Sequence, residues 1–424
     1  MRTMNRRAAL RGGAGALSSL LIRGLASGLP PAYLLKPSAA RAQMMPQTPQ
    51  TLILSTSSRG DPINVNCPGS YTEGVYNNPE LETRRGSFGG DRHRAARVWC
   101  DLPRALRRRL AFVHYSPRTA AHPEYSYTMS FRGEVKQEMG NGSEMFASAM
   151  AQEAYTQGVH LQPEPIPVCS SFLTYKGQPL QLIKPAELRA LFSVTDRELA
   201  DLRQTRNDVL DALYSEMKVS GTQAQRAFVE RYATSREQAR NLGERLGEYL
   251  TDLSELVDDP NGAEAQVIAA VALAKLNITP VITVNIPFGG DNHQDVGLIR
   301  ERDDAISGVE AIKSLWNRLN ALEIQNQVTF ATMNVFGRRG YTNQRGGRDH
   351  NAHHAVMVTF GSEIQGGVYG RMNAQGRATA IGQVQVGRTM EAAGTSLAHA
   401  LGHRPDRMNT RIPNGRLING FLKS

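Results

Sequence analysis

Acidic and histidine side chains gather in one short stretch of the sequence, from Gly346 to His354. It holds Asp349 and three histidines, His350, His353 and His354, within six residues, although the whole chain has only ten histidines. Aspartate and histidine are the usual protein ligands of zinc, iron and manganese. The stretch therefore predicts half of a metal site, with Asp349 and His350 as its main ligands.

A second stretch supplies the expected other half. Asp291 and His293 follow a pair of glycines that comes two residues after an apolar run at residues 280–286. Asp61 follows another such run, and it is either a third ligand or a simple turn residue before proline. The secondary candidates each have a structural alternative, such as strand packing or a surface salt bridge: His114, His122, Arg348, His353 and His354.

The elements that must position these residues alternate between strands and helices. Apolar runs of strand length occupy residues 51–55, 110–115, 280–286, 327–333 and 355–360, and helical patterns cover 263–276 and 303–322. This alternation predicts a three-layer αβα fold with a mainly parallel sheet. Ligands of such sheets gather beyond the carboxyl ends of the strands. Both acid–histidine pairs follow strands, so we expect them at the same edge.

A charged block spans residues 185–258, approximately. Its apolar residues recur at three- and four-residue steps, and this spacing indicates helices. Thr195 and Glu198 have the spacing of a capping box, and a strong breaker follows at 259–262. We interpret the block as a helical insertion in a single α/β domain that spans residues 43–424.

The first 42 residues are typical of a twin-arginine signal peptide. Arg6 and Arg7 precede a modest apolar stretch, and Ala40-Arg41-Ala42 offers a cleavage site. The stretch is too short and too polar for a stable membrane span. We therefore expect export to the periplasm or beyond, with the twin-arginine translocase as a partner. A disordered basic tail is the alternative.

The net charge gives no argument for a nucleic-acid partner. Residues 1–42 contain seven basic side chains and no acid, and removing them from the formal charge of +10 leaves +3. The three cysteines, Cys67, Cys100 and Cys169, have no CxxC spacing. They predict either one disulfide with an unidentified pairing or three buried thiols.

Several motifs together resemble a known family. They are Gly289-Gly290-Asp291-Asn292-His293, the loop from Phe336-Gly337-Arg338 to Gly346-Gly347-Arg348-Asp349-His350, and Gly366-Gly367-Val368-Tyr369-Gly370. The chain resembles a family of twin-arginine-exported bacterial proteins with a domain of unknown function, related to the alkaline-phosphatase and sulfatase superfamily. The resemblance implies an alkaline-phosphatase-like fold. It also implies a divalent metal, zinc first, with Ca, Mg or Mn as alternatives.

The resemblance implies hydrolysis of a small-molecule or polymeric anionic ester of the phosphate or sulfate type. Asp349 and His350 would bind one metal, and Asp291 and His293 the same or a neighbouring one, with Asp61 as an early-strand ligand. The nucleophile stays unassigned, because Ser57, Ser58 and Thr119 carry no distinguishing signature. The sulfatase Cys-x-Pro-x-Arg signature is absent. The alternative is a non-catalytic periplasmic or cell-surface binding protein that retains the fold.

Overall fold

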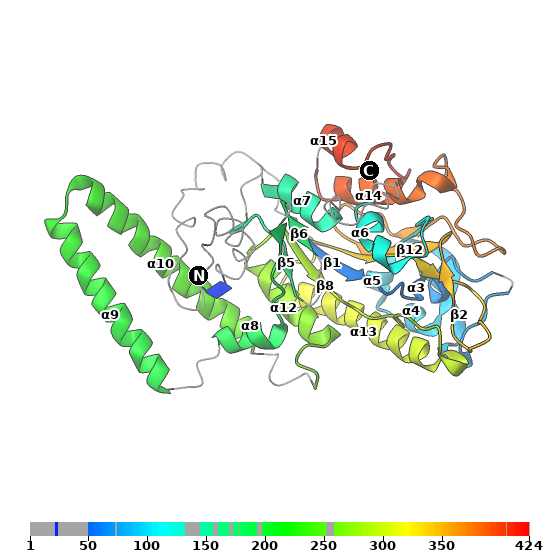
Figure 1. Ribbon diagram of the computed structural model, residues 1–424, viewed down its shortest axis with the longest axis horizontal. Coiled ribbons are helices and arrows are strands. Elements are labelled where there is room, and N and C mark those ends of the chain that lie inside the picture. The colour runs from blue at the N-terminus through cyan, green and yellow to red at the C-terminus, as the bar shows by residue number, and fades with distance from the viewer. Residues whose placement is uncertain are drawn as a thin grey trace, which may run out of the picture.

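Seven strands form the central sheet of the computed structural model, in the order β13-β4-β12-β9-β1-β8-β5 (Figure 1). The structure describes residues 22–23, 50–72, 74–131, 145–155, 160–168, 173–176, 178–192, 197–251, 258–403 and 405–423. In chain order the sheet strands are β1 (Thr51–Ser57), β4 (Ala111–Tyr115), β5 (Ile166–Pro167), β8 (Val281–Val284), β9 (Val328–Asn334), β12 (Ala355–Phe360) and β13 (Gly367–Tyr369). The five strands predicted from apolar runs are all present.

The sheet is mainly parallel, as the alternating pattern predicts. Strand β1 pairs in parallel with β8 on one side and β9 on the other, and β5 pairs in parallel with β8. Strand β13 pairs in parallel with β4. Only β12 runs against both of its neighbours, β4 and β9. This reversal matters for the site, because the start of β12 lies at the same edge as the carboxyl ends of β1, β8 and β9.

Helices cover both faces of the sheet, which gives three layers (Figure 1). Along β1, Ile53 packs with helices α12 (Ala263–Lys275) and α13 (Ile299–Ala321), whereas Leu52 and Leu54 pack with the other face. That face is covered by α7 (Phe146–Tyr155), α14 (Thr389–Ala400) and α15 (Pro405–Arg411). Successive side chains of a strand point to opposite faces, so a strand buried on both sides is apolar throughout.

The remaining elements are short, apart from a pair of long helices. The predicted helical block contains α8 (Pro185–Phe192), α9 (Arg197–Ser220) and α10 (Gln223–Tyr249), and α9 and α10 project from the body (Figure 1). Thr195 of the predicted capping box lies outside the described residues, but a capping box does form at Thr222 and Gln225. The short helices are α3 (Ile63–Asn66), η4 (Pro79–Leu81), α4 (Arg97–Cys100), α5 (Arg104–Arg109), η5 (His122–Glu124), α6 (Tyr125–Thr128), η6 (Val296–Leu298) and η7 (Val386–Arg388). Small ladders join β2 (Thr83–Phe88) to β3 (Asp91–Ala96), β6 (Thr174–Tyr175) to β7 (Gln178–Pro179), and β10 (Gly337–Arg338) to β11 (His350–Asn351).

Two sequence-based expectations fall largely outside the described residues. Of the expected signal peptide, only residues 22–23 are described, and Cys169 is not. Cys67 and Cys100 are both free thiols. No helix in the described part of the chain is long and apolar enough to cross a membrane.

A buried pair of histidines joins β4 to β12. His114 Nε2 lies 2.8 Å from the Pro68 carbonyl and must donate to it, which leaves Nδ1 as the acceptor for His354 Nε2 at 2.9 Å. His354 Nδ1 then accepts from the side-chain amide of Asn64 at 3.0 Å. Each ring nitrogen therefore has one partner, and both rings are neutral. Burial lowers the pKa of His114 to about 4 and the pKa of His354 well below its usual value.

We expect this pair to make the fold sensitive to acid. The pKa of His114 is about 4 in the folded state and about 6.5 when unfolded, so the unfolded chain binds the extra proton first as the pH falls. Its stabilisation is complete above pH 6.5 and is lost between about pH 6.5 and 4, by roughly 3 kcal/mol. Denaturant unfolding at pH 7.5 and 4.5 in the presence of chelator measures the loss. His114→Gln should flatten this pH dependence relative to the wild type, and an unchanged slope would refute the assignment.

Candidate metal centre

The site forms where three loops meet at the carboxyl edge of the sheet. Glycines permit the contact: a Cβ on Gly347 would lie 1.9 Å from the Asn292 carbonyl oxygen, and one on Gly60 would lie 2.0 Å from the Phe336 ring. Gly60 also has a φ of +67°, which side chains rarely adopt. The loop before β12 therefore packs directly on the loop after β8, although β1 lies between β8 and β9 in the sheet.

Three side chains from these loops turn their ligand atoms toward one another. They are His122, Asp291 and His350, and the atoms all lie within 4.8 Å of each other. His122 Nε2 is 3.5 Å from Asp291 Oδ2, and His350 Nε2 is 3.8 Å from Asp291 Oδ1. Two imidazole nitrogens and a carboxylate oxygen are a donor set of the kind that holds zinc. The described residues thus contain a group that can bind a metal ion.

The hydrogen bonds of the two histidines determine which nitrogen faces the centre. His122 Nδ1 lies 2.7 Å from the Ser58 carbonyl, and His350 Nδ1 lies 2.5 Å from the Ala120 carbonyl. A carbonyl only accepts, so each Nδ1 must carry a proton, and in its neutral form each ring presents a lone pair on Nε2. Both Nε2 atoms lie within 3.8 Å of the Asp291 carboxylate, which also only accepts. Such an arrangement of acceptors is favourable when a cation or an added proton lies among them.

Arg338 holds Asp291 in place. Its buried guanidinium donates to Asp291 Oδ1 at 2.7 Å and to the carbonyls of Gly60 and Arg59, both at 2.6 Å. Desolvation works to raise the pKa of Asp291, but the hydrogen bond and charge of Arg338 outweigh it, so this pKa is lower than usual. Asp291 is thus ionised at neutral pH, with Oδ1 occupied by Arg338 and Oδ2 turned toward His122.

His293 and Asp349 extend the centre on one side. His293 Nε2 lies 2.8 Å from His350 Nε2 and donates to it when His350 is protonated on Nδ1 alone. The same Nε2 is 3.4 Å from Asp291 Oδ1, and His293 Nδ1 is 3.4 Å from Asp349 Oδ1. The structure therefore brings the two sequence-predicted acid–histidine pairs together. A hydrogen bond from Asn343 lowers the pKa of Asp349, and this effect is larger than the opposing effect of partial desolvation. Asp349 lies behind His293 and not within the group of His122, Asp291 and His350.

A buried salt bridge fastens the loops that carry these pairs. Arg348 donates to Glu301 of α13 through Nε at 2.7 Å and through a terminal nitrogen at 2.9 Å, and both side chains are fully buried. Asn292 donates to the same carboxylate at 2.8 Å. The sequence suggested a surface salt bridge or an anion site for Arg348. The salt bridge exists, but it is buried, because the glycine-rich loop folds inward over α13.

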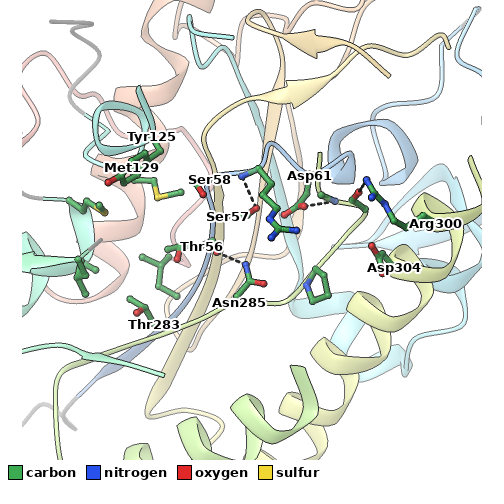
Figure 2. Close-up of a pocket in the computed structure, with 18 residues that line it drawn as sticks. Thr56, Ser57, Ser58, Asp61, Tyr125, Met129, Thr283, Asn285, Arg300 and Asp304 are labelled. Atoms are coloured by element: carbon green, nitrogen blue, oxygen red, sulfur yellow. Dashed lines mark hydrogen bonds between the residues drawn. The ribbon is translucent and has the colours of Figure 1, made fainter. Parts of the chain in front are cut away.

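Asp61 lies beside a cavity of about 420 Å³ next to the centre (Figure 2). Its buried carboxylate accepts from the Gly290 backbone at 2.7 Å and is hydrogen-bonded to the Ser57 hydroxyl. Desolvation raises the pKa of Asp61. The cavity opens near the metal centre, since Ser58 and Arg59 line both the cavity and the opening beside His122 and Asp291. Asp61 therefore lies next to Ser57 in the lining of the cavity, and it is not part of the group of His122, Asp291 and His350.

The other secondary candidates lie elsewhere. His114 and His354 form the buried pair between β4 and β12. His353 is exposed, in the turn between His350 and β12. His122, by contrast, faces Asp291. Among the histidines considered as secondary ligands, only its ring is brought to the centre.

Two residues of the centre have roles that the sequence did not reveal. Arg338 pairs with Asp291, and the Phe336 ring packs against His350 and His122, with centroid distances of 4.2 and 4.9 Å. Both belong to the Phe336-Gly337-Arg338 segment that the motif comparison singled out. Their proximity to Asp291 depends on tertiary contacts that no local pattern encodes.

A sequence model of the family described as "Protein of unknown function (DUF1501)" matches residues 127–416. The chain belongs to this DUF1501 family. The match contains both acid–histidine pairs, Asp291 with His293 and Asp349 with His350, as well as Arg338 and Glu301. Asp61 and His122 lie before the matched range. No curated protein matches the chain.

Solved structures similar to this DUF1501 protein include the crystal structure of Ps i-CgsB. It has a TM-score of 0.35 and 11% sequence identity, and the alignment covers 87% of this chain and 75% of that one. The complex of Ps i-CgsB with k-i-k-neocarrahexaose has a TM-score of 0.34 at 11% identity, covering 86% and 74%. At these scores the similarity carries no argument about activity.

Proposed function

We propose that this protein is an exported, metal-dependent hydrolase of phosphate- or sulfate-type esters with an alkaline-phosphatase-like fold. The observation that carries the proposal is the grouping of His122, Asp291 and His350: their ligand atoms all lie within 4.8 Å of one another, and the Nδ1 hydrogen bonds of both rings leave Nε2 for the centre. The ester class comes from the motif resemblance, and the position of the centre at the carboxyl edge of the sheet agrees with it.

A metal ion here would act as a Lewis acid on an oxygen of the ester. The residues of the chain would do the rest. The carbonyls of Ser58 and Ala120 fix the rings of His122 and His350, so that Nε2 points to the centre. Arg338 fixes Asp291 and adds a positive charge. Together with a divalent ion, that charge leaves the centre suited to an anionic substrate.

The export part of the proposal rests on the N-terminal sequence. Arg6 and Arg7, the apolar stretch and the Ala40-Arg41-Ala42 site support a twin-arginine signal. That route carries folded proteins, which suits a metal that is bound before export. Fractionation of cells that express the full chain tests it, with Arg6→Lys/Arg7→Lys as the matched variant that should remain in the cytoplasm.

We expect chelation to remove ester hydrolysis. Wild-type protein loaded with zinc should hydrolyse 4-nitrophenyl phosphate or 4-nitrophenyl sulfate, and chelator should lower kcat/KM by about 10²- to 10⁴-fold, because Lewis-acid stabilisation is worth several kcal/mol. Re-addition of Zn²⁺ or Mn²⁺ should restore the rate. Hydrolysis that persists after complete metal removal would contradict the proposal. A metal-loaded protein inactive on both ester types would favour the non-catalytic binding protein.

A further inference from the structure

The cavity beside the metal centre has two chemically different ends. Figure 2 shows Tyr125, Met129 and Thr283 at one end and Asp61, Arg300 and Asp304 at the other, with Ser57 and Asn285 between them. Leu54, Met145 and Leu173 add apolar wall. A volume of about 420 Å³ lies in the range of small-molecule sites. The cavity is thus sized for a small ligand with a carbon skeleton and polar groups.

Two polar groups that line this cavity have room for a ligand's hydrogen bonds. Thr283 is only 1% exposed, and its Oγ1 has no hydrogen-bond partner in the described part of the chain. The half-buried Asp304 carboxylate lies within reach of the Arg300 charge, but among the described residues it accepts no hydrogen bond. A buried polar group without a partner costs free energy that a bound ligand can recover. Since a carboxylate only accepts, the ligand group that meets Asp304 must be a donor.

We propose that this cavity binds the alcohol portion of the ester, and that this alcohol is small and carries hydrogen-bond donors, as a polyol or an amino alcohol does. The inference rests on the proposed function in placing the ester's anionic group at the metal centre. Ser58, Arg59 and Tyr125 line both the cavity and the opening beside His122 and Asp291, so one small molecule can reach both.

The walls of the cavity offer groups for both parts of a small polar alcohol. Asp61 and Asp304 line the cavity together with Arg59 and Arg300, so it carries charges of both signs, and the proposed function places the phosphate or sulfate at the metal centre. Desolvation raises the pKa of Asp304, and donors from a ligand would replace the water that this carboxyl lacks. Met129 and Met145 are adaptable apolar surfaces for the carbon skeleton. The proposal therefore favours a small-molecule ester over a polymeric one.

Three phosphate monoesters test the inference: glycerol phosphate, phosphoethanolamine and propyl phosphate, whose alcohol has a similar length but no donor. We expect kcat/KM for the donor-bearing esters to exceed that for propyl phosphate by about tenfold or more, since a site built for hydrogen bonds rejects analogues that lack them. Asp304→Asn should weaken phosphoethanolamine more than glycerol phosphate, which separates an ammonium from a hydroxyl donor. Thr283→Val should reduce the preference for both.

Matched variants control for effects on folding. Asp303→Asn changes the neighbouring, exposed acid of α13, which pairs with Arg302. Thr329→Val removes another buried hydroxyl without a partner, but one that does not line the cavity. Neither should alter the preference among the three esters. If Thr329→Val lowers it as much as Thr283→Val does, the cavity assignment is wrong.

A binding measurement separates this inference from the proposed function. Saturation-transfer NMR on metal-free His350→Ala protein should detect ethanolamine or glycerol, and should detect propan-1-ol more weakly. Hydrolysis of all three esters at equal rates would overturn the inference and leave the proposed function standing. Binding of ethanolamine that Thr283→Val abolishes, without hydrolysis of any ester, would overturn the proposed function and leave the cavity assignment standing. Absence of both would overturn both.

Discussion

His350→Ala is expected to abolish stoichiometric binding of zinc. The substitution removes one of the two Nε2 atoms that are grouped with the Asp291 carboxylate. Loss of an outer-shell partner of a metal ligand costs about 10- to 100-fold in affinity, so loss of a ligand itself should cost more. Asp291→Asn should have a comparable effect. Zinc-loaded protein, dialysed and titrated against a chromophoric chelator, gives the affinity.

The same loop offers a matched control for this experiment. His353 is an exposed histidine three residues from His350, and it lines a different cavity, with Thr72 and Met372. His353→Ala should leave both stoichiometry and affinity as in the wild type. The metal assignment is wrong if His350→Ala protein, shown to be folded by circular dichroism, retains zinc with wild-type affinity. It is equally wrong if His353→Ala loses as much zinc as His350→Ala.

Glu301→Gln is expected to destabilise the fold by about 3 to 5 kcal/mol, because it leaves the buried charge of Arg348 without its partner. Arg348 is fully buried, and Glu301 supplies the opposite charge through two hydrogen bonds. Guanidinium unfolding in the presence of chelator measures the change without a contribution from bound metal. The loops that carry Asp291 and His350 should loosen too, so that zinc affinity falls as well.

An exposed pair on the same helix provides the comparison. Glu310 and Lys313 form a salt bridge on α13 with side chains that are 60% and 37% exposed. Glu310→Gln should change stability by less than about 1 kcal/mol, as surface pairs do. The double variant Glu301→Leu/Arg348→Met should recover much of the loss, since no unpaired charge remains. If Glu301→Gln costs no more than Glu310→Gln, the buried pair does not fasten the loops.

Local patterns were sufficient to predict the sheet and its carboxyl edge. Apolar runs of strand length depend on burial on both faces of a sheet, so β1, β4, β8, β9 and β12 could be read from the chain. The sequence also predicted that Asp291 and the loop to His350 would meet at one edge. It did not predict that β12 runs against its neighbours. The direction of β12 depends on the edge of the sheet at which the preceding loop ends. An apolar run predicts a buried strand but not the direction in which it runs.

Within the site, the sequence determined which residue types could bind a metal but not which of them meet. His122, His114 and His354 looked alike as candidates, yet only His122 faces Asp291, because its ring is held by the Ser58 carbonyl. Arg348 and Arg338 are both buried cations, and only the folded chain pairs one with Glu301 and the other with Asp291. These pairings join residues that are 47 positions apart in both cases. The physical reason is that hydrogen-bond partners across such separations are set by packing between loops, whereas the sequence pattern reports only the burial of each segment.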